Sequence, residues 1–191
     1  MLIALDVAIL LPPDISRRAI ELSAAFPERE SQGLRLGGDV MPHVTLSQLF
    51  VPVEELDLAL DQVGSTLAGM AALHLTVTGP GRRRSSVWMS VHPTPAVIEL
   101  HQRLMDVLHR FERPDGTQAA FFNGDARPGD VAWVADFRRT SSYAAFSPHI
   151  TLGHASTLPD VELLTFDATT IAACHLGRFC TCRRILRQWE L

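Results

Sequence analysis

Apolar residues along this chain follow two different periods. In several segments they alternate with polar residues or form short continuous runs, and both patterns predict β-strands. Elsewhere they recur every three or four residues, which predicts the buried face of an amphipathic helix. The strand patterns cover residues 2–11, 43–51, 73–78, 86–92, 149–154, 169–176 and about 182–189, and the helical patterns cover about 15–26, 54–70 and 95–111.

Turn-forming residues separate these segments. Asp14 follows two prolines and is the expected N-cap of the first helix. Gly79-Pro80-Gly81 is expected to turn a hairpin between the third and fourth strands. Residues 112–142 are the least regular, although residues 131–137 could form one arm of a hairpin. Because strands and helices do not alternate strictly, we expect an α+β fold with mainly antiparallel sheets.

The composition is that of a soluble globular protein. Hydrophobic residues make up 47% of the 191 residues and charged residues 20%, and we expect one domain over residues 1–191 and a monomer. No stretch reaches the roughly 18–20 apolar residues that cross a bilayer. The opening residues 1–11 contain Asp6 and lack a basic leader. We therefore expect a cytoplasmic protein with no membrane partner.

The charged residues exclude several classes of protein. A formal net charge of −4 argues against a general nucleic-acid coat protein, because such proteins bind by neutralising phosphates. All 17 basic residues are arginine. The chain therefore has no P-loop lysine, no Schiff-base lysine and no lysine that could form a nucleotidyl intermediate.

One short motif occurs twice, in distant parts of the chain. Residues 42–46 read Pro-His-Val-Thr-Leu, and residues 148–152 read Pro-His-Ile-Thr-Leu. Each copy stands at the head of a predicted strand, where a proline is tolerated because its missing N–H costs little. A single His-x-Thr is common in ordinary strands, so it is the duplication that indicates function.

The motif residues suit acid–base chemistry at phosphorus. Side chains alternate along a strand, so His43, Thr45 and Ser47 are expected on one face, as are His149 and Thr151 in the second copy. Imidazole titrates near neutral pH, so one ring can act as base while the other acts as acid. The threonine hydroxyls can bind the non-bridging phosphate oxygens. Such a displacement needs no metal and no cofactor.

At these residues the sequence resembles the two-histidine (2H) phosphoesterase superfamily, in particular bacterial 2′-5′ RNA ligase-like proteins. The resemblance covers most of the chain. It includes the Leu-Pro-Pro that ends the first strand, residues 43–50 leading to Pro52, Val87-Trp88-Met89, residues 146–153 and the closing strand from Cys182 to Leu191.

The resemblance implies two pseudo-symmetric α+β lobes around a central groove, with flanking helices. It implies hydrolysis of 2′,3′-cyclic phosphates, related cyclic phosphodiesters or 2′-5′ linkages, so the expected substrate is a small cyclic nucleotide or an RNA 3′ end. By position, His43 and His149 would be the acid–base pair, and Thr45 and Thr151 would hold the phosphate. Residues 112–142 could form a lid or insertion over the groove.

The chain departs from the family pattern at one position. Many relatives have a basic residue soon after the second motif, where this chain has His154. A protonated histidine can bind phosphate, so His154 is a candidate for substrate binding. The change also leaves open a non-catalytic module that binds phosphate or RNA ends in the same groove.

Other candidates have a plain structural alternative. Arg139 and Tyr143 precede the second motif and could bind phosphate or stack on a base. Phe146 could lie at the groove edge or in the core. Arg82-Arg83-Arg84 could meet an RNA backbone, or could be a solvated hairpin tip.

The cysteines do not have the spacing of a zinc knuckle. Cys174, Cys180 and Cys182 lie close to His175 near the end of the chain, and cysteine and histidine are the usual zinc ligands. Alternation would put Cys180 and Cys182 on one strand face. We expect buried, reduced cysteines and no metal site.

Overall fold

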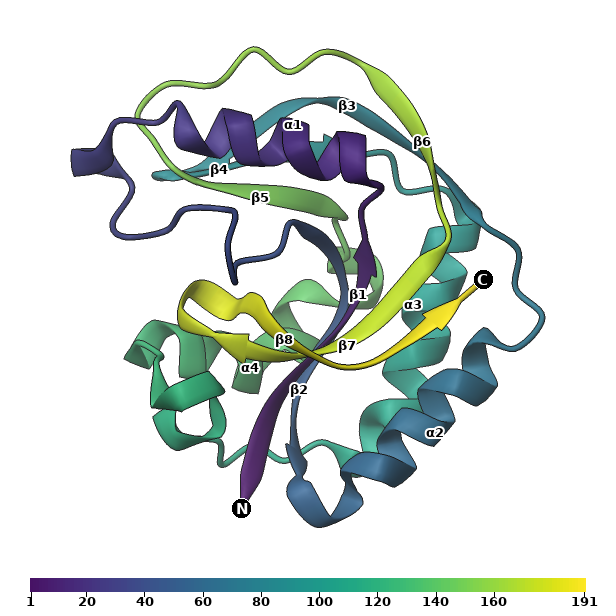
Figure 1. The fold of residues 1–191 in the computed structure, drawn as a ribbon. Helices are drawn as coiled ribbons and strands as arrows, with labels where there is room; N and C mark the ends of the chain where they lie inside the picture. The colour runs from purple at the N-terminus through teal and green to yellow at the C-terminus, as the bar shows by residue number, and fades with distance from the viewer.

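The two motif strands are neighbours at the centre of one sheet. The computed structural model describes residues 1–191. Its eight strands form a curled antiparallel sheet in the order β6-β3-β4-β5-β2-β1-β7-β8 (Figure 1). The strands are β1 (Leu2–Leu10), β2 (His43–Pro52), β3 (Leu73–Arg83), β4 (Ser86–Val91), β5 (His149–His154), β6 (Leu164–Ala168), β7 (Thr170–Gly177) and β8 (Thr181–Glu190).

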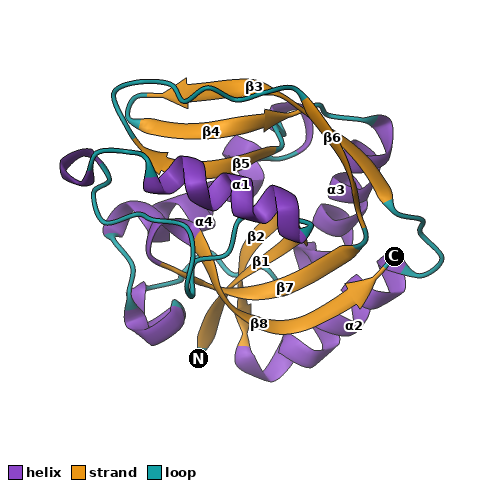
Figure 2. Cartoon of the chain, turned by 45° about the horizontal axis from the view of Figure 1, so that its top comes forward, coloured by secondary structure: helices purple, strands orange, loops and turns teal.

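Four helices flank this sheet (Figure 2). They are α1 (Pro13–Ala24), α2 (Leu56–Leu67), α3 (Pro95–Leu108) and α4 (Pro128–Ser141). The α+β class and the antiparallel sheet predicted from the sequence are confirmed. None of the helices is both long enough and apolar enough to cross a membrane.

The sheet divides into two similar lobes that share one core. The first lobe contains β1, β2, β7 and β8, and the second contains β3 to β6. A strand, a helix and an antiparallel neighbouring strand recur in both, as β1-α1-β2 and as β4-α3-β5, the second with α4 inserted between α3 and β5. Each helix packs on the motif strand of the other lobe, α1 on β5 and α3 on β2 (Figure 1). One cluster of 35 buried hydrophobic residues therefore runs through both lobes.

The hairpin predicted at Gly79-Pro80-Gly81 is wrong in its turn position. β3 continues through these residues and pairs with β4 as far as Arg83 opposite Ser86. A bulge near Thr78 uses the positive φ of Gly79 (137°). Pairing between β3 and β6 ends at Val77, so the rest of β3 is an edge that tolerates Pro80.

The hairpin arm predicted at residues 131–137 is also wrong, because this segment lies in α4. The Asp130 carboxylate accepts hydrogen bonds from the backbone N–H and the guanidinium of Arg127, the N-cap residue, and Pro128 follows in the first turn, so the helix starts here. Val134 and Phe137 are buried at helical spacing. Local capping and the spacing of three residues therefore outweigh the β-propensity of the valines.

One smaller prediction is wrong, and one strand was not predicted. Asp14 is not the N-cap of α1; Pro12 occupies that position without a side-chain cap, and Asp14 lies in the first turn. There its carboxylate is favourably placed near the positive end of the helix dipole. Strand β6 was not predicted, because Leu164–Ala168 has only five residues and follows a long irregular loop.

A buried histidine of α3 ties the two motif segments together. His101 is fully buried, and its Nδ1 donates to the backbone oxygen of Leu46 at 2.6 Å. Its Nε2 accepts a hydrogen bond from the backbone N–H of Tyr143 at 2.9 Å. Phe146 stacks on the ring with centroids 3.8 Å apart. Burial lowers the pKa of His101, so the neutral tautomer that makes both bonds is favoured.

We predict that His101→Leu lowers the free energy of unfolding by about 2–4 kcal/mol, because it leaves a buried carbonyl and a buried N–H without partners, each costing about 1–3 kcal/mol. His109→Leu, at an exposed position just beyond α3, is the matched control and should change stability by less than about 0.5 kcal/mol. Urea denaturation followed by circular dichroism measures both. Equal effects of the two changes would contradict the bridging role.

Candidate active site

A cleft of about 770 Å³ opens over the junction of the two lobes. Its lining includes the imidazole and hydroxyl side chains of both motifs, together with residues of α4, of the β3–β4 hairpin and of the short turn before β8. This volume lies in the range of about 300–1,000 Å³ typical of small-molecule sites. The motif residues are His43, Thr45, His149 and Thr151.

A single backbone pairing places the two motifs. Val44 and Ile150 lie opposite each other where β2 meets β5, and both are fully buried. The histidine and threonine on either side of each point to the other face, into the cleft. Continuing this register puts His43 and His149 on a diagonal across the strand pair, where Cα atoms are about 7–8 Å apart. Both rings can therefore reach one phosphate group.

Each imidazole is oriented by a hydrogen bond from Nδ1 to the backbone oxygen two residues earlier. His43 Nδ1 lies 2.8 Å from the oxygen of Met41, and His149 Nδ1 lies 2.7 Å from the oxygen of Ser147. A carbonyl only accepts, so Nδ1 must carry the hydrogen in both rings. Nε2 is then left as the reactive nitrogen on each side.

Matching bulges change which residues face the cleft. β2 has one extra residue between the pairs Ala8–Thr45 and Val7–Ser47, and β5 has one at the corresponding place. The alternation beyond Thr45 is therefore reversed. Ser47 is buried and does not line the cleft, contrary to the sequence prediction, whereas Gln48 does.

The bulge in β5 has the same effect on the second motif. Gly153 takes the place corresponding to Ser47 and has a φ of 145°, which favours glycine. His154 consequently lines the cleft, and its role in substrate binding stays a prediction.

The two halves differ in one buried carboxylate. Asp6 lies in the middle of β1 and is fully buried, and its Oδ2 is 3.7 Å from Nε2 of His43. The same oxygen accepts hydrogen bonds from Thr45 Oγ1 at 2.9 Å and from Gln48 Nε2 at 2.7 Å. The corresponding position in β4 is Ser86, so only His43 has a carboxylate partner.

Hydrogen bonds extend from this carboxylate to the cleft wall. Gln48 Oε1 accepts from the indole of Trp133 on α4 at 3.0 Å. Burial raises the pKa of Asp6, while His43 and the two hydrogen-bond donors act in the opposite direction. Sequence reasoning did not assign Asp6 to the site. The available signal was a carboxylate within the otherwise apolar run of residues 2–11.

His149 has a more apolar environment than His43. Its ring lies 5.3 Å from the ring of Trp88, measured between centroids, and no carboxylate pairs with it. Burial is the main cause that lowers its pKa below the ordinary 6.5, and the facing His43 adds to this effect. The Thr151 hydroxyl has no partner within the protein, whereas the Thr45 proton is donated to Asp6.

Cations lie along the rim of the cleft beside His154. Arg83 and Arg84 line it and form no ion pair. Arg127 also lines it, stacked on Phe179 at 3.8 Å. Arg83 and Arg84 of the arginine triplet thus lie at the cleft, whereas Arg82 donates to the backbone oxygen of Ser156, and a contact of the triplet with an RNA backbone stays a prediction. Arg127, which is ion-paired with Asp130, is the cation near His154.

Two predicted substrate-binding residues lie elsewhere. Tyr143 is outside the cleft, and its hydroxyl donates to Asp106 on α3 at 2.7 Å. Arg139 is exposed and pairs with Asp136 one turn earlier in α4. Arg139 lies in the last turn of α4 and Tyr143 in the short helical turn that follows, and this placement could not be foreseen because the segment was not expected to be helical. Phe146 lines the cleft edge and also stacks on His101.

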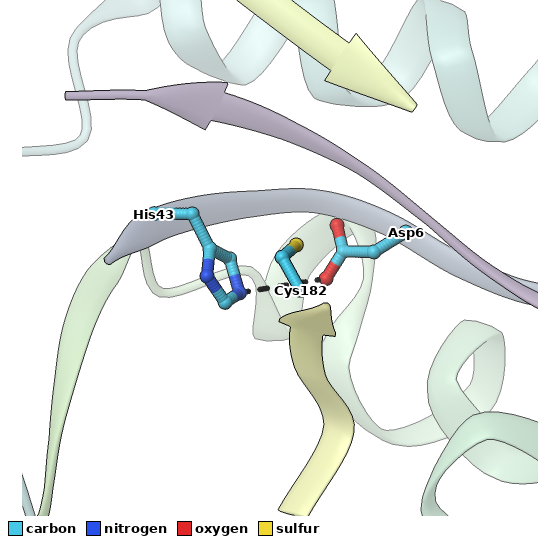
Figure 3. A group of neighbouring side chains, drawn as sticks. All are labelled: Asp6, His43 and Cys182. Carbon is cyan, nitrogen blue, oxygen red and sulfur yellow. Dashed lines mark ion pairs between the residues drawn. The ribbon is translucent and has the colours of Figure 1, made fainter. Parts of the chain in front are cut away.

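The three cysteines are unpaired, and Cys174 and Cys182 are buried as expected, whereas Cys180 is only half-buried. Cys180 lies in a short turn and not on the face of β8, and Cys182 is buried beside Asp6 and His43 (Figure 3). Burial raises the pKa of both thiols well above the ordinary value. Both are therefore protonated and weak nucleophiles.

Comparisons with known proteins agree with this geometry. A family model described as the 2′-5′ RNA ligase superfamily matches residues 11–175. No curated protein gives a significant match to the chain in sequence.

Solved structures share the fold. Escherichia coli LigT, in a crystal structure complexed with NADP+, is 22% identical with a TM-score of 0.67, covering 100% of this chain and 99% of its own. A structure described as a phosphoesterase is 21% identical with a TM-score of 0.64, covering 98% of each chain. TT0787 of Thermus thermophilus is 18% identical with a TM-score of 0.62, covering 99% of this chain and 98% of its own.

We predict that Asp6→Asn stabilises the protein at neutral pH. The native pKa of Asp6 is raised above its ordinary 3.8, so below pH 3.8 the carboxyl is protonated in both states and no charge is buried. As pH rises through the native pKa the buried group must ionise, and the free energy of unfolding falls. The variant, which has no charge to bury, should therefore exceed the wild type in free energy of unfolding by more at pH 7 than at pH 4. Urea titrations at both pH values measure the difference, and a gap independent of pH would contradict it.

Proposed function

The chain belongs to the 2′-5′ RNA ligase superfamily, and from this premise we propose that it hydrolyses 2′,3′-cyclic phosphates or related cyclic or 2′-5′ phosphodiesters of RNA ends or small nucleotides. The observation that carries the proposal is the convergence of His43 and His149, each with Nδ1 bonded to a backbone oxygen, in one cleft. Proteins of the 2H superfamily are generally phosphoesterases or ligases.

His149 is the better general base. Burial favours its neutral form, so Nε2 holds a free lone pair that can take a proton from water. The resulting hydroxide attacks phosphorus and opens the cyclic phosphate. His43 is the better general acid, since a proton on its Nε2 lies beside the Asp6 carboxylate and can be passed to the leaving 3′-oxygen.

The transition state gathers negative charge on the non-bridging oxygens. The unpartnered hydroxyl of Thr151 can donate to one of them. Thr45 would have to release Asp6 before it could do the same, so its first role is to hold the carboxylate next to His43.

The rim of the cleft suits a nucleotide or an RNA end. The aromatic faces of Trp88 and Phe146 can stack with a base. Arg83 and Arg84 carry no ion pair and can meet an additional phosphate. Arg127, which is ion-paired with Asp130, adds a guanidinium near His154 at the same rim.

We predict that His43→Ala and His149→Ala each lower kcat for a 2′,3′-cyclic nucleotide by on the order of 10²–10⁴, because each removes one proton-transfer group. The wild-type enzyme should keep its activity in EDTA. His74→Ala is the matched control, since His74 is exposed and pairs with Asp167 on the sheet edge. Product formation is measured by chromatography, with circular dichroism to check folding. Tight binding of a cyclic-ended oligonucleotide without any turnover would instead support the binding module.

The pH dependence tests which histidine is the base. Because burial lowers the pKa of His149, the acidic limb of kcat/KM against pH should have its midpoint below 6.5. Asp6→Asn should leave this limb in place, because Asp6 is not among the groups that shift the pKa of His149. An acidic limb that moves in Asp6→Asn would reverse the assignment of base and acid.

A further inference from the structure

Three side chains with metal-binding atoms meet beside the cleft. They are Asp6 from β1, His43 from the start of β2 and Cys182 from the start of β8 (Figure 3). One ligand atom of each lies within 4.8 Å of the other two. The backbone fixes this arrangement, because the N–H of Met41 donates to the oxygen of Cys182 at 3.1 Å, two residues before His43.

One buried oxygen of this cluster has no partner. Asp6 is fully buried, and its Oδ1 makes no hydrogen bond, although its Oδ2 accepts two. The Cys182 sulfur points toward this carboxylate (Figure 3). A buried carboxylate oxygen without a donor is costly. A cation held between the two side chains would satisfy it.

The surrounding hydrogen bonds are those that orient metal ligands. A ligating histidine usually donates its other ring N–H to a carbonyl or carboxylate, and a ligating carboxylate is itself hydrogen-bonded. His43 Nδ1 bonds to Met41 in this way, and Asp6 Oδ2 accepts from Thr45 and Gln48. His149 makes the same backbone bond but has neither a carboxylate nor a thiol beside it.

We propose that Asp6, His43 and Cys182 bind a zinc ion, and that the bound ion inhibits the enzyme. Ligands at 2.0–2.3 Å around a tetrahedral zinc lie about 3.3–3.8 Å apart, and the separation of 3.7 Å between Asp6 Oδ2 and His43 Nε2 fits. On binding, Cys182 releases its thiol proton to solvent. The carboxylate and the thiolate then cancel the charge of the ion.

Inhibition follows from the ligand that His43 supplies. A metal–nitrogen bond uses the Nε2 lone pair of His43, so this nitrogen can neither hold nor deliver a proton. This second half of the proposal rests on the proposed phosphoesterase function, whereas binding of the ion does not.

The test uses the metal-stripped full chain with zinc chloride alone in isothermal titration calorimetry, and cobalt chloride as a spectroscopic probe. We expect one ion per chain and a near-ultraviolet thiolate-to-cobalt charge-transfer band. Cys182→Ser, which keeps the size of the side chain, should lose the band and weaken zinc binding at least about 100-fold, beyond the effect of most outer-shell changes. Cys180→Ala is the matched control and should bind like the wild type, since Cys180 lies at the cleft but outside the cluster.

Activity provides a separate measurement. Zinc should inhibit hydrolysis of a 2′,3′-cyclic nucleotide by the wild type and by Cys180→Ala, and EDTA should restore the rate, whereas Cys182→Ser should keep its activity in zinc. No binding by the wild type, or unchanged binding by Cys182→Ser, overturns the site. If zinc binds but stimulates hydrolysis, the proposed inhibition is wrong and the proposed binding site stands. If no cyclic phosphate is hydrolysed, the proposed function fails, but calorimetry and the cobalt band still decide the site.

Discussion

The candidate site depends on one short contact between two strands. β2 and β5 pair through Val44 and Ile150, and beyond that point each strand belongs to its own lobe. Because neighbouring side chains point to opposite faces, burying these two aliphatic residues forces the four motif side chains into the cleft. A slip of one residue in either strand would bury a histidine and expose an aliphatic residue instead. The hydrophobic effect thus fixes the position of the polar groups.

On this symmetric frame, a single carboxylate makes the two histidines different. In both rings Nδ1 donates a hydrogen bond to the backbone oxygen two residues earlier, and both have a threonine two residues later. Only His43 lies beside Asp6. Acid–base catalysis needs one ring protonated and the other neutral, and two identical environments would give both rings the same proton affinity. Burial of Asp6 works against folding, which is typical of residues kept for function.

The sequence predicts the fold class, most elements and the four motif residues, because these depend on periodicity and on an exact repeat. The sequence does not predict which side chains face the cleft where this depends on tertiary contacts. The bulges that bury Ser47 and turn Gln48 into the cleft have no local signal apart from Gly153. Asp6 was read as part of a buried strand, which is correct, but its function depends on β2 and β8 packing beside it. Arg127 and Trp133 reach the cleft only because residues 128–141 are helical.

The exchange of helices between the lobes bears on how the chain folds. Since α1 covers β5 and α3 covers β2, neither lobe has a complete core when it is alone, although each contains a strand–helix–strand unit. When the N-terminal half of the chain leaves the ribosome, the face of β2 that α3 covers would stay exposed until α3 has been synthesised. Folding should accordingly be cooperative over the whole chain, and a backbone break between β2 and β3 would give two fragments that become ordered only on joining.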